Sequence, residues 1–313
     1  MDEFIPAADE VNRLQRGKDT ESRLFQAFAE QGHYKGRFKP SNTRQGIYAT
    51  TPNGKFLASC NTRQAGVVAK MMRRALDRWK QIDKSQRRLT DKQLASLKNT
   101  RRWEAKYPED GLVLRVTTRD LPGAKKGRDW KENAWNLDYA WFKKDEALEF
   151  VPAKTAIDES REVSEKIMRR LVRLHLLDYV RGQVSTFSNK DVEKARLTAT
   201  VVRVEKNRME LRLEGETRAV RRGRWAISGF KKQPDQQEIG FETTILGHAT
   251  FDTKKQRFVA FEMIATGTRW GGTQFNGRSD SLGAGPIGAV LSLGSGEVSE
   301  RVAPARIRSY GWR

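Results

Sequence analysis

The stretch Leu197-Thr-Ala-Thr-Val-Val-Arg-Val-Glu-Lys-Asn-Arg-Met-Glu-Leu-Arg-Leu213 decides the fold class of this protein. Two β-prone runs flank the polar Glu-Lys-Asn-Arg in its middle. In the second run, apolar Met209, Leu211 and Leu213 alternate with charged residues, which is the period of a strand with one buried face. The stretch therefore predicts an antiparallel hairpin with one apolar side.

The same design recurs further along the chain. Residues 243–251 and 257–265 surround a polar Asp-Thr-Lys-Lys turn, and a last apolar run begins at Ile287. An antiparallel sheet with one apolar face needs a cover. The best helical pattern nearby is 162–180, so we expect one main covering helix there and an α+β fold.

The start of this β-rich region is less regular. Gly111-Leu-Val-Leu-Arg-Val-Thr-Thr predicts a strand, and Trp130, Trp135 and Trp141 then follow within a short aromatic stretch. We interpret these rings as packing between the sheet and its covering segments. A Gly-x-Gly-x-x-Gly run at Gly283 precedes a strand instead of a helix, so it does not predict a dinucleotide site. No cofactor is expected.

The first 80 residues predict alternating elements. A helix begins at Thr20, and two β-prone runs surround Pro52-Asn-Gly54, a strong hairpin signal. Residues 65–80 then form an amphipathic helix. We expect its apolar face to pack on the hairpin strands that hold Ile47, Tyr48, Phe56 and Leu57. The residues of that face are Val68, Met71, Met72, Leu76 and Trp79.

This first region resembles a thioredoxin fold that lacks its opening β-α unit. The resemblance covers residues 3–80 and rests on Phe4-Ile-Pro-Ala-Ala-Asp-Glu-Val, Ala29-Glu-Gln-Gly-His-Tyr and Thr43-Arg-Gln-Gly-Ile-Tyr, which are similar to a group of uncharacterised bacterial thioredoxin-like proteins. It implies a strand at Phe4, in addition to the hairpin and its closing helix. The residues themselves allow either a strand or an extended lead-in from Phe4 to Val11.

The resemblance does not extend to redox chemistry. Dithiol exchange needs a nucleophilic cysteine and a resolving cysteine, whereas the chain has one cysteine, Cys60. A lone thiol is therefore the remaining redox candidate, and a small buried apolar residue is its simpler interpretation. The three histidines, His33, His175 and His248, are far apart in sequence and predict no metal site.

Charge supplies the other functional signal. The chain holds 60 Lys and Arg against 39 Asp and Glu, a net charge of +21. Residues 70–106 alone hold 13 basic and 4 acidic side chains, and 217–232 hold no acid. Such clusters are typical of proteins that bind anionic polymers. The candidate anion-binding residues are Lys70, Arg73, Arg74, Arg78, Arg87, Arg88, Arg221, Arg222 and Arg224.

Together these patterns predict a degenerate thioredoxin-like domain over 1–80, a basic linker or helix over 81–110, and an antiparallel β-rich domain over 111–313. We expect a non-catalytic scaffold or partner-binding protein. The alternatives are a binder of an anionic polymer, most plausibly nucleic acid, and an enzyme with a site near the tryptophans and His248. As it stands, the sequence predicts a cytoplasmic protein; an exported one is the alternative if a leader precedes Met1.

Overall fold

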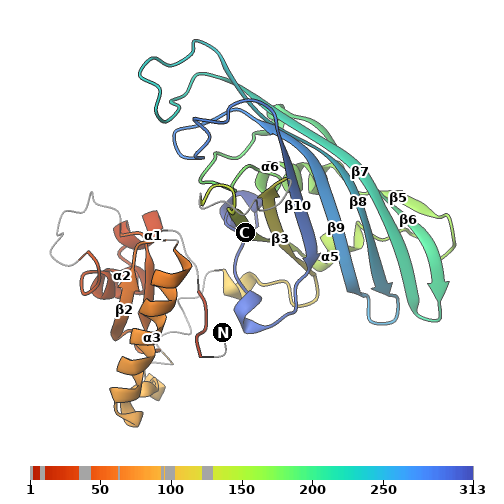
Figure 1. The fold of residues 1–313 in the computed structure, drawn as a ribbon. Coiled ribbons are helices and arrows are strands. Elements are labelled where there is room, and N and C mark those ends of the chain that lie inside the picture. The colour runs from red at the N-terminus through yellow and green to blue at the C-terminus, as the bar shows by residue number, and fades with distance from the viewer. Residues whose placement is uncertain are drawn as a thin grey trace. The chain divides into compact units, whose positions relative to one another are not determined.

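The structure is a computed structural model that describes residues 3–7, 11–34, 44–62, 64–92, 95, 103–121 and 130–312. The chain divides into two units, Met1–Ala105 and Lys106–Arg313 (Figure 1). Helices and a strand pair make up the first, and an eight-stranded antiparallel sheet dominates the second, which confirms the α+β class. Residues 93–94 and 96–102 of the predicted linker lie outside the described part of the chain.

Unit 1 contains helices and one strand pair: α1 (Val11–Arg16), α2 (Thr20–Ala29), β1 (Ile47–Thr50), β2 (Phe56–Cys60) and α3 (Ala65–Gln81). α2 begins where expected because the Asp19 carboxylate accepts a 3.0 Å hydrogen bond from the Ser22 amide. β1 and β2 pair antiparallel, and the Thr51 amide donates to the Lys55 carbonyl across the turn. Gly54 has φ +83°, which suits glycine. The predicted hairpin is confirmed.

The packing of this hairpin confirms the expectation for α3 in part. α3 covers one face, where Met71 and Ala75 share a core cluster with Ala49 and Ala58 of the two strands. Ile47, however, is exposed, and Tyr48 turns to the opposite face, where its ring lies 5.6 Å from that of Phe25 in α2. Because neighbouring residues of a strand point to opposite faces, one helix cannot cover both, and the strand pair lies between α2 and α3.

The strand implied at Phe4 does not form in the described residues 4–7. Residues 4–7 are irregular, and residues 8–10 lie outside the described part of the chain. Pro6 has no amide hydrogen to donate to a neighbouring strand. Phe4 instead packs its ring against the cluster beneath α3.

Unit 2 is built on a sheet whose strands lie in the order β4-β3-β10-β9-β8-β7-β6-β5, each antiparallel to its neighbours. The strand bounds are β3 (Leu112–Asp120), β4 (Trp135–Phe142), β5 (Ser160–Glu162), β6 (Val192–Glu205), β7 (Arg208–Gly223), β8 (Gln237–Asp252), β9 (Arg257–Trp270) and β10 (Gly285–Leu293).

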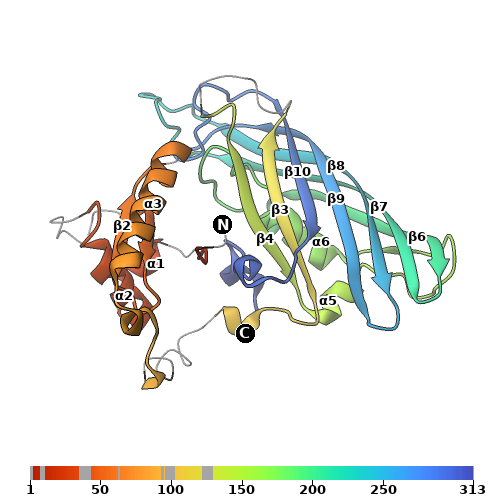
Figure 2. The ribbon, with the colours of Figure 1, turned by 60° about the horizontal axis from the view of Figure 1, so that its bottom comes forward.

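The alternating runs form the central hairpins as predicted. Met209, Leu211 and Leu213 of β7 are buried on the inner face, and Leu211 pairs with Ala249 of β8. The apolar face is covered by the short helix α5 (Lys144–Leu148) and by α6 (Glu165–Leu174), which lies on the inner side of the curved sheet (Figure 2). α6 is shorter than the predicted 162–180, because the chain leaves the helix at His175.

The structure also corrects the interpretation of the tryptophan-rich stretch. It forms an edge strand, β4, and does not simply fill space beside the sheet. Trp141 is fully buried, with its ring 5.3 Å from Tyr107, whereas Trp130 and Trp135 are exposed. The Trp141 amide at the open edge donates to the Tyr310 hydroxyl, and its carbonyl accepts from Arg170. Side chains thus protect this edge from pairing with another chain.

Candidate functional site

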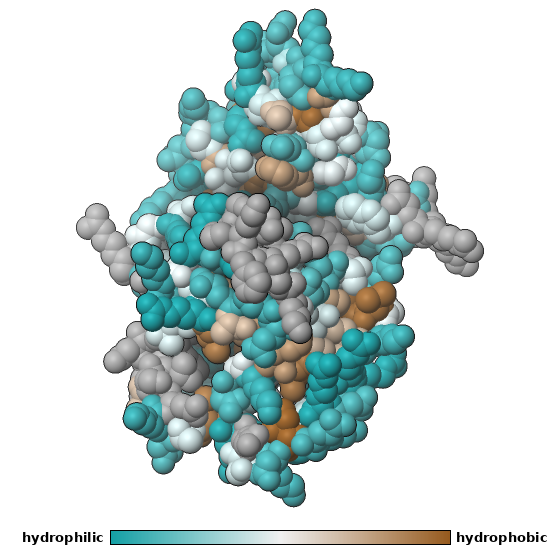
Figure 3. All heavy atoms as spheres, turned by 90° about the vertical axis from the view of Figure 1, so that its left-hand side faces the viewer, coloured by the Kyte–Doolittle hydropathy of each residue, from teal (hydrophilic) through white to brown (hydrophobic). Residues whose placement is uncertain are grey.

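The outward face of α3 gathers basic side chains that the sequence predicted to bind an anion: Lys70, Arg73, Arg74 and Arg78. They are exposed, while Met71 on the opposite side is buried. Residues three and four apart are neighbours on a helix surface, so these side chains form one stripe. Hydrophilic side chains also predominate on the face drawn in Figure 3.

The charges of this stripe are largely unpaired. Among the described residues, no carboxylate lies within 4.0 Å of Lys70, Arg73 or Arg74. Arg78 differs, because its guanidinium donates a hydrogen bond to the Leu57 carbonyl. Asp77 is an exposed acid on the same face and reduces the local surplus. The stripe still presents a net positive charge to solvent.

Arg87 and Arg88, which follow α3, differ in role. The guanidinium of Arg87 donates 3.0 Å hydrogen bonds to the carbonyls of Ile82 and Lys80 and lies 5.1 Å from the centre of the Trp79 ring. Arg87 therefore satisfies the hydrogen-bonding capacity of carbonyl groups at the C-terminal end of α3. Arg88 is exposed and can extend the basic stripe.

The second predicted basic segment is mostly engaged within unit 2. Arg222 pairs with Glu238 at 2.9 Å and with Glu193 at 3.3 Å. The sequence shows no acid within 217–232, but neighbouring strands supply these partners. An exposed arginine with two carboxylates attracts an anion far less than an unpaired one.

The other two candidate arginines of this segment, Arg221 and Arg224, also have local partners. Arg221 donates weak hydrogen bonds to the Ser185 and Thr186 carbonyls and lies over the Trp225 ring, and burial lowers its pKa. Arg224 donates to the Asp235 carbonyl at 2.7 Å. These contacts fix the loop ends, so α3 is the stronger of the two predicted anion-binding surfaces.

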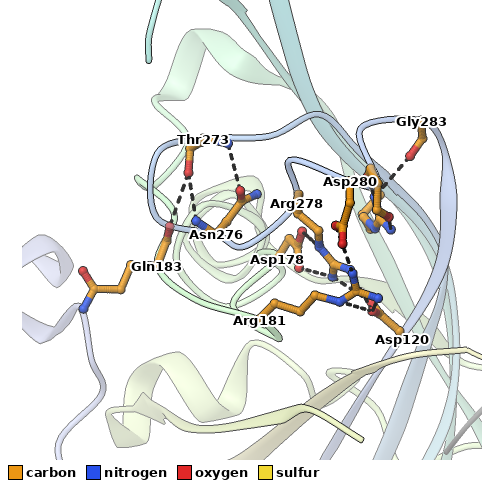
Figure 4. Close-up of polar contacts among 11 residues, drawn as sticks. Asp120, Asp178, Arg181, Gln183, Thr273, Asn276, Arg278, Asp280 and Gly283 are labelled. Atoms are coloured by element: carbon orange, nitrogen blue, oxygen red, sulfur yellow. Dashed lines mark hydrogen bonds and ion pairs between the residues drawn. The ribbon is translucent and has the colours of Figure 1, made fainter. Parts of the chain in front are cut away.

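Sequence reasoning missed a buried ionic cluster at one end of the sheet (Figure 4). Arg278, in the β9–β10 loop, donates 2.7 Å hydrogen bonds to both carboxylate oxygens of Asp120. It also donates to both oxygens of Asp178, at 2.6 and 2.7 Å. Arg181 adds a 3.1 Å hydrogen bond to Asp120. The two carboxylates therefore clamp one guanidinium from both sides.

The electrostatics of this cluster favour its charged form. Burial acts to lower the pKa of Arg278, but Asp120 and Asp178 outweigh burial and raise it. Burial acts to raise the pKa of Asp120, but Arg278 and Arg181 hold it below its ordinary value. Because Arg278 is fully enclosed, it holds the β9–β10 loop against the sheet and cannot reach a ligand. No local pattern around Arg278 distinguishes it from a surface arginine.

A second buried network joins the C-terminal segment to α6. Nδ1 of His175 lies 3.1 Å from a carboxylate oxygen of Asp138, and Nε2 lies 2.6 Å from the Tyr310 hydroxyl. Acid, imidazole and hydroxyl are the groups of a catalytic triad. Here Tyr310 is buried and its hydroxyl also accepts a hydrogen bond from the Trp141 amide, so the hydroxyl serves packing within the fold. The network anchors the chain end.

A polar groove of about 770 Å³ lies between the N-terminus of α6 and strand β6. Its charged lining residues largely neutralise one another: Arg169 pairs with Glu165 at 2.6 Å, and Lys194 pairs with Glu216 at 3.1 Å. The groove therefore presents little net field to a ligand.

Cys60 ends β2 and is half-buried against the cluster that contains Met72 and Trp79. Its place fits a small packing residue at the edge of a core. Within the described residues, no group of His, Cys, Asp and Glu side chains is arranged to hold a metal ion. In the same part of the chain, no helix is long and apolar enough to cross a membrane.

Comparison of the chain with protein-family models, with curated proteins and with solved structures gives no match.

Proposed function

We propose that this protein binds an anionic polymer, and specifically nucleic acid, through the exposed basic face of α3. The proposal rests on Lys70, Arg73 and Arg74, which are exposed and have no carboxylate partner among the residues that the structure describes. A cation that already has a carboxylate partner must give it up to bind phosphate. An exposed cation without such a partner gives up only loosely held solvent ions. Binding to phosphate is therefore favoured at low salt.

The proposal gives unit 1 the role of a scaffold. We propose that it is a degenerate thioredoxin-like domain, in which the hairpin and α3 form the part that the resemblance covers. A hairpin lying between α2 and α3 supports this assignment. Such a unit offers a rigid surface, and the single cysteine of the chain excludes dithiol exchange.

The test is a salt titration of binding to a fluorescently labelled DNA duplex, followed by anisotropy. The test variant carries Lys70→Gln, Arg73→Gln and Arg74→Gln. Each lost phosphate contact reduces the slope of log K against log salt by roughly 0.9, so we expect a slope smaller by about 2 to 3 and much weaker binding at low salt.

A control variant removes the same amount of charge from unit 2, through Arg203→Gln, Arg212→Gln and Arg222→Gln. These side chains are comparably exposed but paired with glutamates. The control should bind DNA almost as the parent does. Equal loss in both variants would mean that only net charge matters, and preference for heparin over DNA would contradict the nucleic-acid assignment.

A further inference from the structure

The face of the unit 1 hairpin opposite α3 carries a serine–histidine pair. The hydroxyl oxygen of Ser59, on β2, lies 2.8 Å from Nδ1 of His33, which follows α2. On the other side of the ring, Nε2 lies 3.2 Å from the Gln45 carbonyl oxygen. Both side chains are half-buried, so neither is sealed inside the core. The proposed DNA-binding surface uses neither of them.

The Gln45 carbonyl determines which ring nitrogen carries the proton. The Tyr48 hydroxyl also lies 3.5 Å from Nε2, but it donates its hydrogen bond to the Arg44 carbonyl at 2.8 Å. A carbonyl oxygen only accepts hydrogen bonds, so the Gln45 carbonyl places the proton of the neutral ring on Nε2 of His33. Nδ1 is then free to accept, and the Ser59 hydroxyl is the donor. A hydroxyl that donates to an imidazole, whose other nitrogen is held by a third group, is the arrangement of an activated nucleophile.

The ring and the hydroxyl are held in place from several directions. The His33 ring lies between Tyr34 and Tyr48, with ring centres 4.4 and 5.0 Å away. The His33 amide also donates a 3.0 Å hydrogen bond to the Ser59 oxygen. A donor to that oxygen stabilises the negative charge it gains when its proton leaves.

Two glycines make this approach possible. A Cβ atom at Gly32 would lie 2.5 Å from the Ser59 oxygen, and one at Gly46 would lie 2.5 Å from the His33 ring. Both distances are shorter than atoms tolerate, so any side chain at either position would push the pair apart. Gly46 also has φ +152°, a conformation that favours glycine. The two Gln-Gly segments of the sequence thus meet at this pair, with residues 31–32 beside Ser59 and residues 45–46 beside His33.

We propose that Ser59 is a nucleophile with His33 as its general base, and that this site transfers acyl groups from activated esters. The Ser59 oxygen attacks the ester carbonyl carbon while its proton passes to Nδ1 of His33. The carbon–oxygen bond to the leaving group breaks, and the leaving alkoxide takes that proton. Water then attacks the acyl-Ser59 ester, losing a proton to Nδ1, and the serine oxygen recovers it as the acid departs.

The experiment incubates the intact protein with p-nitrophenyl acetate and, separately, with a fluorophosphonate probe, and locates any adduct by peptide mass spectrometry. We expect acetyl and phosphonyl adducts on Ser59. Ser59→Ala should abolish both. General-base assistance contributes roughly 100-fold or more to such a step, so His33→Gln should slow labelling by about that factor.

Ser85→Ala is the control, because Ser85 is an exposed serine of the same unit whose hydroxyl donates to a carboxylate, Asp83. It should label as the parent does. Circular dichroism of each variant identifies loss of folding, and the adduct position in the parent protein does not depend on any variant. An adduct confined to Cys60 or to lysines, or a parent rate retained in His33→Gln, overturns the proposal.

Discussion

Arg278 and Asp120 lie 158 positions apart in the chain and share two parallel hydrogen bonds of 2.7 Å. The same guanidinium binds Asp178, so one arginine joins the end of β3, the segment after α6 and the β9–β10 loop. Two-point arginine–carboxylate contacts are the strongest and most geometrically specific of the common ion pairs. This residue is therefore the electrostatic anchor of unit 2.

Replacing this anchor should destabilise unit 2 strongly. Arg278→Ala leaves Asp178, itself 5% exposed, as a buried charge without its main partner. Removing one member of a buried pair costs on the order of 3–5 kcal/mol, and we expect a loss of this size in denaturant-induced unfolding. Arg212→Ala, which removes an exposed arginine paired with Glu214, should change stability by less than about 1 kcal/mol. Similar losses in the free energy of unfolding for the two variants would contradict the role of Arg278 as an anchor.

The same cluster should make stability fall in acid. Burial acts to raise the pKa of Asp120, but the hydrogen bonds and charge of Arg278, with Arg181, bring it below the ordinary 3.8. A carboxyl with a lowered pKa in the folded state stabilises the fold above its unfolded pKa. That contribution disappears as the pH falls through the folded value. The free energy of unfolding should therefore drop below about pH 4, and less steeply in Asp120→Asn.

This acid limb should be measured by urea unfolding at a series of pH values. Glu146 contributes in the same direction, because burial is outweighed by Arg170, which lowers its pKa. Asp120→Asn should consequently flatten the limb without removing it. An unchanged slope below pH 4 in that variant would show that Asp120 does not contribute.

Patterns that are local in sequence predicted structure well. Met209 and Leu211 alternate with charged neighbours, and both lie on the buried face of β7. β4 escaped prediction as a strand because its second half, near Trp141, is covered on both faces and shows no alternation. Arg278 escaped as a site residue because its partners come from distant segments, and only the folded sheet brings them together.

The sequence also did not predict which face of the hairpin each helix covers. The pattern around Tyr48 shows that the strands carry large apolar side chains, but α2 and α3 compete for two faces with similar character. The basic face of α3 was predictable, because the helical spacing of basic and apolar residues is visible within this one segment of the sequence.

Loss of the Tyr310 hydroxyl should weaken the C-terminal anchor. Tyr310→Phe preserves the ring but leaves Nε2 of His175 and the Trp141 amide without their shared partner. An unsatisfied buried polar group costs roughly 1–3 kcal/mol. We expect a loss in this range by thermal or denaturant unfolding, together with faster amide hydrogen exchange at Trp141. Unchanged exchange there would show that the edge of β4 does not depend on this hydroxyl.

The orientation of α3 can be tested by comparing its two sides. Met71 is 6% exposed and belongs to the core cluster that includes Ala49 and Ala58 of the hairpin, so Met71→Ala leaves a cavity. Substitutions of this kind cost about 2–5 kcal/mol. Arg74 is exposed and has no acidic partner among the described residues, so Arg74→Ala should cost less than about 0.5 kcal/mol. DNA affinity should show the reverse pattern. Arg74→Ala should weaken DNA binding, whereas the folded fraction of Met71→Ala should bind DNA as the parent does. If Arg74 proved the costlier loss in unfolding, its side chain would be engaged within the fold, and α3 would no longer be available as the DNA-binding surface.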